Sequence, residues 1–206
     1  MSGHRLRLRG AHEPSLFIAP LPESGVDLVA SGGDIRLYRG WLALERANAL
    51  LATIHATTAW TAERRKMYDR FIDVPREQAW FGDDRERPFT PALAALRAEL
   101  EAFAATRFSY VLLNRYRDGA DSVAWHNDRE VAGSPRPVIA SLTLGATRAF
   151  DLRAKADRSR VVSVDLDHGD LIVMRGAAQA RFEHRIAKDR RVTGERINLT
   201  FRQLPD

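Results

Sequence analysis

Two segments in the first half of the chain carry apolar residues at the spacing of an amphipathic helix. Residues 42–57 (LALERANALLATIHAT) and 91–105 (PALAALRAELEAFAA) repeat apolar side chains at intervals of three and four positions. Thr90 and Pro91 give the second segment an N-cap residue followed by the residue that is favoured at the first helical position. We expect a helix in each segment.

From residue 109 onward the pattern changes to short runs rich in β-forming residues. Turn signals such as RDGAD, GSPRP and DHGD separate these runs. The predicted strands cover residues 109–117, 137–145, 147–154, 160–167, 170–176, 181–187 and 196–204. Short strands at this spacing favour an antiparallel sandwich or jelly roll, with the helices packed outside it.

Residues 60–90, between the two predicted helices, follow neither pattern. They are rich in charge, aromatic residues and proline, so we expect a surface excursion rather than a part of the core. The chain has 206 residues, enough for a sizeable core, and we find no repeat, linker or low-complexity stretch. A single domain is therefore expected over residues 1–206.

The composition excludes several kinds of site. Because the chain has no cysteine, it has no disulfide, thiol nucleophile or thiolate metal site, and nitrogen and oxygen must hold any metal. Basic residues exceed acidic ones by 32 to 27, a net charge of +5, with local clusters at 62–71 and 187–191. This excess suggests a polyanionic partner, but the clusters by themselves are better explained as a solvated helix face.

The N-terminal stretch MSGHRLRLRGAHEP is basic, contains glycine and proline, and has no apolar region behind it. It does not resemble a secretory signal, and the chain has no run of about 18 apolar residues that would span a membrane. We expect a cytoplasmic protein that does not enter a membrane. Nothing in the sequence indicates an oligomer, so a monomer is expected.

A histidine and two acidic residues alternate in the stretch AWHNDRE, residues 124–130. In an extended strand alternate side chains share a face, so His126, Asp128 and Glu130 would lie together. His126 and Asp128 could supply two ligands of a two-histidine, one-carboxylate iron site. His184, inside a predicted strand, is the best third ligand. The alternative is a polar strand face that meets water.

The last predicted strand has a polar face that consists of Arg196, Asn198, Thr200 and Arg202. A guanidinium binds a carboxylate through two hydrogen bonds and stays charged, so this face could hold a carboxylate cosubstrate. The stretch LLNRYR offers further donors in Asn114 and Tyr116. The alternatives are a solvated strand face, a capping asparagine and a core tyrosine.

Taken in order, LLNRYRDGADSVAWHNDRE, SLTLGATRAFDLR, GDLIVMRGAAQARFEHRIAK and ERINLTFR resemble the AlkB family of Fe(II)/2-oxoglutarate dioxygenases, in particular its branch that acts on alkylated DNA bases. The likeness runs from about residue 60 to 204. It implies an α+β, mainly β fold: a double-stranded β-helix (jelly roll) over about 109–204, with supporting N-terminal helices. It also implies a nucleotide-recognition lid over about 60–90.

The resemblance assigns roles to individual residues. The iron ligands, which are also the catalytic residues, would be His126, Asp128 and His184. The residues that bind 2-oxoglutarate would be Asn114, Tyr116, Arg196, Asn198 and Arg202. Among these, Arg202 would pair with the C5 carboxylate, and Arg196 would support the C1 end and the aspartate ligand.

The resemblance also implies substrate contacts from Glu130, Tyr68, Arg76 and Trp125. Glu130 would meet an exocyclic amino group of the target base, and Tyr68 would be a finger residue that enters the base stack. Arg76 would touch the nucleic-acid backbone or support the lid, and Trp125 and Trp80 could stack on a base. The plainer alternatives are a surface aromatic for Tyr68, a salt bridge for Arg76 and a place in the core for each tryptophan.

The implied reaction is oxidative demethylation of DNA bases such as N1-methyladenine and N3-methylcytosine. It would use Fe(II), 2-oxoglutarate and O₂, and release formaldehyde, succinate and CO₂. A methyl group on the pairing edge is unreachable in a duplex, so the base must be flipped out. The alternatives are the same chemistry on RNA or protein, a small-molecule 2-oxoglutarate hydroxylase, and a non-catalytic β-sandwich that binds nucleic acid through charge.

Two departures from the family pattern affect these expectations. Ala187 stands where the histidine motif usually continues into a proline. Between FGDD and TPAL the chain is short, so an aromatic-rich hairpin of some relatives is missing. The second departure leaves open which side chains would hold the flipped base.

Overall fold

Strands make up most of the described part of the chain, which covers residues 5–8, 25–29, 34–67, 70–83, 85–128 and 137–203 in the computed structural model. The helices are α1 (Leu44–Thr57), α2 (Pro91–Ala104) and α3 (Ala178–Arg181). The strands are β1 (Arg5–Leu8), β2 (Val26–Asp27), β3 (Asp34–Tyr38), β4 (Thr61–Met67), β5 (Arg70–Gly82), β6 (Tyr110–Tyr116), β7 (Val123–His126), β8 (Val138–Gly145), β9 (Arg148–Ala154), β10 (Val161–Leu166), β11 (Leu171–Arg175), β12 (Phe182–Ile186) and β13 (Arg196–Arg202).

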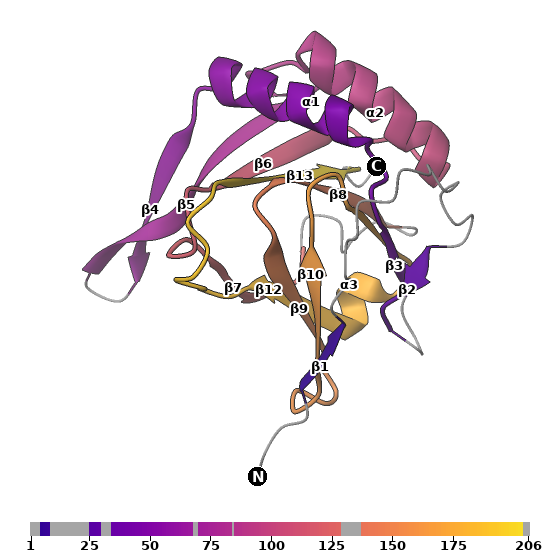
Figure 1. Ribbon diagram of the computed structural model, residues 1–206, viewed down its shortest axis with the longest axis vertical. Helices are drawn as coiled ribbons and strands as arrows, with labels where there is room; N and C mark the ends of the chain where they lie inside the picture. Colours follow the sequence, from indigo (N-terminus) through magenta and orange to yellow (C-terminus); the bar gives the residue numbers. More distant parts are fainter. Residues whose placement is uncertain are drawn as a thin grey trace.

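Two sheets lie face to face. The larger has the order β2-β3-β11-β8-β13-β6-β5-β4, and the smaller has the order β1-β10-β9-β12-β7. Neighbouring strands are antiparallel except for β1 and β10, which are parallel. Helices α1 and α2 cover the outer face of the larger sheet (Figure 1). This arrangement confirms the predicted jelly roll with supporting helices.

The helices begin and end close to their predicted positions. Helix α2 begins at Pro91, and the Thr90 side chain accepts a hydrogen bond from the backbone N–H of Leu93 at 3.3 Å, as an N-cap residue does. Its residues Leu93, Leu96, Leu100 and Ala104 are buried against the larger sheet. No helix in the described ranges is long and apolar enough to cross a membrane.

The seven predicted strands are present as β6 and β8 to β13, each ending within two residues of its predicted limits. Residues 60–90 depart from the expectation. They form β4 and β5, and β5 pairs with β6, so this segment extends the larger sheet. Ala79 and Phe81 of β5 belong to the core beneath the helices, and the expectation of a surface excursion is wrong for this strand.

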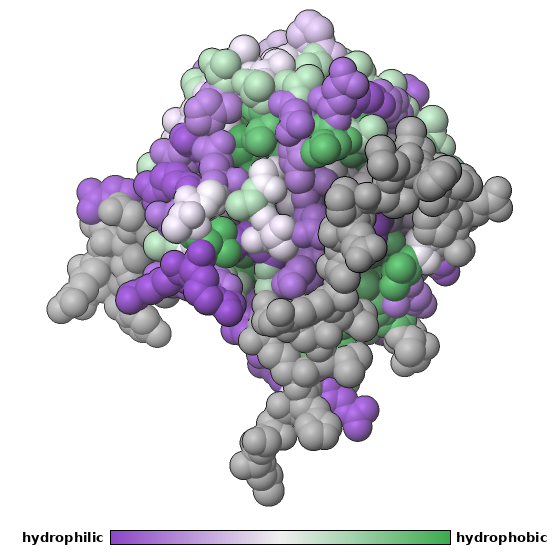
Figure 2. All heavy atoms as spheres, in the orientation of Figure 1, coloured by the Kyte–Doolittle hydropathy of each residue, from purple (hydrophilic) through white to green (hydrophobic). Residues whose placement is uncertain are grey.

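Hydrophilic side chains gather over the loop that joins β12 and β13 (Figure 2). The loop exposes Lys188, Arg190 and Arg191. Arg191 forms an ion pair with Asp189 at 2.7 Å, whereas Arg190 forms no ion pair with a described residue. The loop therefore presents net positive charge to solvent.

Candidate metal centre

A cavity of about 770 Å³ lies between the two sheets. Its floor is the inner face of the larger sheet, where side chains from neighbouring strands form rows. Gln78, Asn114 and Asn198 form one row across β5, β6 and β13, and Tyr116 and Arg196 form part of the next. Strands β7 and β12 supply part of the opposite wall. Ten of the twelve predicted site residues line this cavity, whereas Glu130 and Tyr68 lie outside the described residues.

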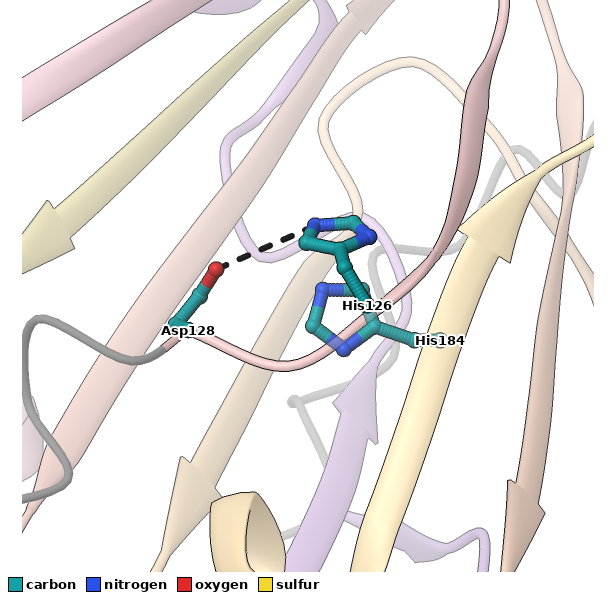
Figure 3. A group of neighbouring side chains, drawn as sticks. All are labelled: His126, Asp128 and His184. Atoms are coloured by element: carbon teal, nitrogen blue, oxygen red, sulfur yellow. Dashed lines mark ion pairs between the residues drawn. The ribbon is translucent and has the colours of Figure 1, made fainter. Parts of the chain in front are cut away.

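Three of these side chains form a compact group of possible metal ligands. His126, Asp128 and His184 each offer one ligand atom, and these atoms lie within 4.8 Å of one another (Figure 3). The two histidines are neighbours because His126 of β7 and His184 of β12 pair directly across the strands. Their ring centroids are 4.3 Å apart. Strand β7 ends at His126, so Asp128 reaches the group from the segment that follows the strand.

A backbone hydrogen bond selects the tautomer of His126. Its Nδ1 lies 2.8 Å from the carbonyl oxygen of Ala124, which can only accept, so Nδ1 carries the proton. Nε2 is then left with its lone pair, and this atom lies 3.9 Å from Oδ1 of Asp128. The ring thus offers its free nitrogen to the centre of the group, as a metal ligand must.

Asp128 is buried and is held from two directions. Its backbone N–H donates to Oε1 of Gln179 at 2.8 Å. Its carboxylate accepts from Arg202, with Nη2 at 2.9 Å from Oδ1 and Nε at 3.3 Å from Oδ2. The Gln179 side chain also donates to the sulfur of Met174 at 3.3 Å, which fixes the amide in the interior. These contacts set the position of the carboxylate independently of strand β7.

The surroundings keep His184 and Asp128 in the protonation states that bind a metal. Burial lowers the pKa of His184 to about 4, and the charges of His126 and Arg202 act in the same direction. Burial would raise the pKa of Asp128, but Arg202 and the two histidines outweigh it, and the pKa lies below its ordinary value. At neutral pH, His184 is therefore neutral and Asp128 is ionised.

This donor set fits Fe(II). Two imidazole nitrogens and one carboxylate oxygen make the facial arrangement that non-heme iron oxygenases use, with the remaining coordination positions open to other molecules. The chain has no thiolate that would favour a softer metal. His126, Asp128 and His184 are thus suited to hold an Fe(II) ion.

Arg196 is buried in the cavity wall and has unused hydrogen-bonding capacity. Its Nη2 donates to Oγ1 of Thr143 at 3.0 Å and to Oδ1 of Asn198 at 2.7 Å. Its Nε and Nη1 have no hydrogen-bond partner among the described residues. Burial lowers the pKa of Arg196 to about 10, so it remains a cation at neutral pH. A buried cation with two unpartnered nitrogens is suited to a carboxylate ligand.

These contacts correct one assignment made from the sequence. Arg196 was expected to support the aspartate ligand, and Arg202 to bind the C5 carboxylate of 2-oxoglutarate. In the structure it is Arg202 that contacts Asp128. The alternation along β13 places both arginines on one face, but it does not tell which of them lies beside Asp128.

The other predicted cosubstrate residues are tied into the cavity wall. The side-chain oxygen of Asn114 accepts from Nε of Arg76 at 2.9 Å and from Nε2 of Gln78 at 2.8 Å, which leaves its amide nitrogen as a donor. Tyr116 lies with its ring centroid 5.2 Å from the guanidinium carbon of Arg196. Asn198 donates from Nδ2 to Thr200 at 2.7 Å, in addition to its contact with Arg196.

Two predicted substrate residues make contacts other than those expected. Arg76 reaches into the cavity to Asn114, so β5 is linked to the cosubstrate wall. The ring of Trp125, which alternates with His126 along β7, has the guanidinium groups of Arg153 and Arg185 at 4.1 and 4.5 Å from its centroid. Trp125 also lines the cavity, and its stacking on a base stays a prediction.

Sequence reasoning missed Gln179 at this site, and it left Trp80 undecided between stacking on a base and a place in the core. Gln179 lies in the single turn of α3, where no motif singles it out. Trp80 is half-buried and lines the cavity from β5. The signal for Trp80 was present, because Arg76, Gln78 and Trp80 alternate within one strand and so share a face.

Comparisons with known proteins agree with this geometry. The sequence model of the 2OG-Fe(II) oxygenase superfamily matches residues 34–202. Alpha-ketoglutarate-dependent dioxygenase alkB homolog 3 of Mus musculus is 34% identical over an alignment of 226 positions, which covers 94% of this chain and 78% of that protein. DNA oxidative demethylase ALKBH2 of Arabidopsis thaliana is 36% identical, with coverages of 92% and 71%.

Two solved structures share the fold at low sequence identity. The structure of OsALKBH1 matches with a TM-score of 0.58 and 15% identity, and covers 82% of this chain and 97% of that chain. A prolyl hydroxylase from Trichoplax adhaerens, in complex with a hypoxia inducible factor peptide, matches with a TM-score of 0.61 and 12% identity, with coverages of 82% and 83%. At these identities the likeness shows the fold alone.

Proposed function

The chain belongs to the AlkB family of the 2OG-Fe(II) oxygenase superfamily, and on this basis we propose that it oxidatively removes N-alkyl groups from the bases of DNA. One relative is named as an alpha-ketoglutarate-dependent dioxygenase and another as a DNA oxidative demethylase. The observation that carries the proposal is the presence, in one cavity, of the ligand group His126, Asp128 and His184 and the unpartnered nitrogens of Arg196.

The residues present define a place for each reactant. His126, Asp128 and His184 would hold Fe(II), and Arg196 would bind the C5 carboxylate of 2-oxoglutarate through Nε and Nη1. When bound, Fe(II) and 2-oxoglutarate supply with O₂ the oxidation that hydroxylates the N-alkyl carbon, with succinate and CO₂ as co-products. The hydroxylated methyl group then leaves the base as formaldehyde.

The protein contributes orientation and a shielded cavity. Arg202 keeps Asp128 ionised and in place, and the Ala124 carbonyl keeps the free nitrogen of His126 directed to the ligand group. Asn114, held by Arg76 and Gln78, retains an amide nitrogen that would donate to 2-oxoglutarate. These groups are fixed before the reactants bind, so little reorganisation accompanies the reaction.

The base would enter from the side of β5. Trp80 lies on the cavity face of that strand, at the side from which a flipped base would enter. N1-methyladenine and N3-methylcytosine suit this site because they pair poorly, which lowers the cost of flipping. Contact of the base with Glu130, and entry of Tyr68 into the stack, remain predictions for residues outside the described ranges.

The proposal can be tested on a single-stranded DNA oligonucleotide with one N3-methylcytosine. The oligonucleotide would be incubated with the protein, Fe(II), ascorbate and 2-oxoglutarate, and the mass of the product would be measured by mass spectrometry. We expect a 2-oxoglutarate-dependent loss of one methylene mass that disappears in His126→Ala. The matched control is His55→Ala, which changes an exposed histidine of α1 that lies outside the cavity lining.

The outcomes separate the parts of the proposal. Succinate formation without a change in the oligonucleotide would retain the oxygenase chemistry and reject this substrate. Conversion of an RNA oligonucleotide of the same sequence at a higher rate would make RNA the substrate. Neither product, from protein shown to contain iron, would reject the function.

A further inference from the structure

A second cavity of about 510 Å³ adjoins the first. The two cavities meet at Gln78 and Trp80, which line both of them. The other residues that line the second cavity are Thr61, Ala79, Arg85, Glu86 and Arg87. Three of the seven lining residues come from the short segment between β5 and α2, and the other four come from β4 and β5.

The short segment is folded into a closed turn. The backbone N–H of Gly82 donates to the carbonyl of Arg87 at 3.0 Å, and the N–H of Arg85 donates to the carbonyl of Gly82 at 3.4 Å. Nη1 of Arg87 also donates to the carbonyl of Ala59 at 2.7 Å. Two arginines are therefore set at defined places on the wall of the second cavity, and Glu86 is the one acidic residue among the described residues that line it.

Arg85 is the cation of this wall that is best placed to bind a ligand. Its guanidinium carbon lies 5.1 Å from the ring centroid of Trp80 and 5.0 Å from that of Tyr110, within the range of a cation–π contact. Arg85 is exposed and forms no ion pair with a carboxylate of the described residues. The aromatic rings thus orient its charge, and its donors remain available to an anion.

We propose that the second cavity binds the nucleotide adjacent to the target base, with its phosphate at Arg85 and its base against Trp80. This inference rests on the proposed function, because it requires the target base in the first cavity. A flipped nucleotide stays joined to its neighbours by phosphodiester bonds, so a cavity that shares a wall with the first is within reach of the next nucleotide. An aromatic surface beside an arginine is the arrangement that binds single-stranded nucleic acid without reading its sequence.

The test compares a one-nucleotide ligand with a longer strand. Wild type, Arg85→Ala and Arg85→Lys would be assayed for kcat/KM on N3-methyldeoxycytidine 5′-monophosphate and on a DNA trinucleotide with the same lesion at its centre. Binding of an unmodified trinucleotide would be titrated in parallel by fluorescence anisotropy. The matched control is Arg107→Ala, an exposed arginine that follows α2 and lines neither cavity.

Arg85→Ala should lose about tenfold on the trinucleotide, through KM and through binding, because stacking and phosphate contacts of one nucleotide are of this size. The loss of kcat/KM on the monophosphate should be much smaller. Arg85→Lys should recover part of the activity that Arg85→Ala loses on the trinucleotide, and Arg107→Ala should behave as wild type. An equal loss on both ligands, or none on the trinucleotide, would overturn the proposal. If the wild type demethylates neither ligand, the proposed function fails, and the anisotropy titration alone decides whether Arg85 binds a strand.

Discussion

Among single residues, substitution of Arg196 and of Arg202 tests which arginine of the cavity binds 2-oxoglutarate and which one holds Asp128. Arg196→Ala removes the unpartnered donors Nε and Nη1, and hydrogen bonds to a charged group contribute about 1.5–3 kcal/mol. The affinity for 2-oxoglutarate should fall at least about tenfold. Arg202→Ala leaves Asp128 buried without its cation, which should lower the unfolding free energy of the metal-free protein by about 3–5 kcal/mol.

Calorimetric titration of 2-oxoglutarate into protein loaded with redox-silent Mn(II) would measure the first effect, and urea denaturation the second. The reverse pattern, in which only Arg202→Ala abolishes 2-oxoglutarate binding, would restore the assignment made from the sequence. Because the two arginines share one strand and one face, each variant serves as the control for the other.

His168 makes the stability of the protein depend on pH. Its Nδ1 accepts a hydrogen bond from the backbone N–H of Gly145 at 2.8 Å, and burial lowers its pKa below the ordinary value of 6.5. As the pH falls through 6.5, the unfolded chain takes up a proton at this position before the folded protein does, so the unfolding free energy decreases. The decrease stops once the pH is below the folded pKa as well.

His168→Asn isolates this effect, because the amide oxygen can replace Nδ1 as an acceptor and does not titrate. Urea denaturation at pH 7.5 and 5.5 should show a smaller decrease in the variant than in the wild type. Equal decreases in the two proteins would show that other groups cause the acid sensitivity.

The types of residue at the site were predictable, but their contacts were not. Alternation identified the polar face of β13, because side-chain direction in a strand follows from local geometry. Asp128 lies beyond the end of β7, and its contacts with Gln179 and Arg202 position it instead. Which arginine meets Asp128 depends on how β13 is placed against the segment after β7, and Gln179 acts from a distant turn. Such long-range contacts leave no periodic signal in the sequence.

Among the elements, two loops hold the strands that carry the histidines. The loop between β6 and β7 is joined to the one after β12 by hydrogen bonds from the N–H of Gly119 to the carbonyl of Val192 and from the N–H of Asp189 to the carbonyl of Gly119, both 2.8 Å. Buried Arg148 adds bonds to the carbonyls of both loops, among them Ala187 at 2.8 Å. The relative position of β7 and β12 therefore depends on these loops.

Gly119→Ala tests this dependence. The added Cβ would lie 1.7 Å from the carbonyl oxygen of Asp189, so the two loops must separate. Overpacking of this kind costs about 1–3 kcal/mol or more, and we expect a loss of at least about 2 kcal/mol in unfolding free energy together with weaker Mn(II) binding. In the control Gly194→Ala the nearest atom is the Cβ of Ala146 at 3.2 Å, and the loss should be smaller. Unchanged metal affinity in Gly119→Ala would show that the loops do not position the ligands.

For the whole molecule, the sequence predicts the jelly roll well because one face of each central strand is apolar. It fails at β5, where Arg76, Gln78 and Trp80 are mixed with core residues such as Ala79 and Phe81. The polar positions of β5 face a cavity rather than bulk water. Hydrophobic pattern alone does not distinguish these two surroundings, so a strand that lines a binding site has the pattern of a surface segment.

The positive charge of the whole molecule should govern its affinity for a nucleic-acid strand and the dependence of that affinity on salt. The net charge is +5, and Lys188, Arg190 and Arg191 are exposed on the loop beside the ligand strand β12. Each phosphate contact contributes a slope of about −0.7 to a plot of log affinity against log salt for a single strand. Arg190→Glu should therefore weaken binding of a fluorescent oligonucleotide and make the slope less negative by about 0.7, the contribution of one phosphate contact.

The control is Arg107→Glu, which makes the same change of charge at a residue that follows α2. This variant should have little effect, because α2 lies on the outer face of the larger sheet. If both variants weaken binding equally, net charge rather than this loop attracts the strand, and the loop has no specific part in docking.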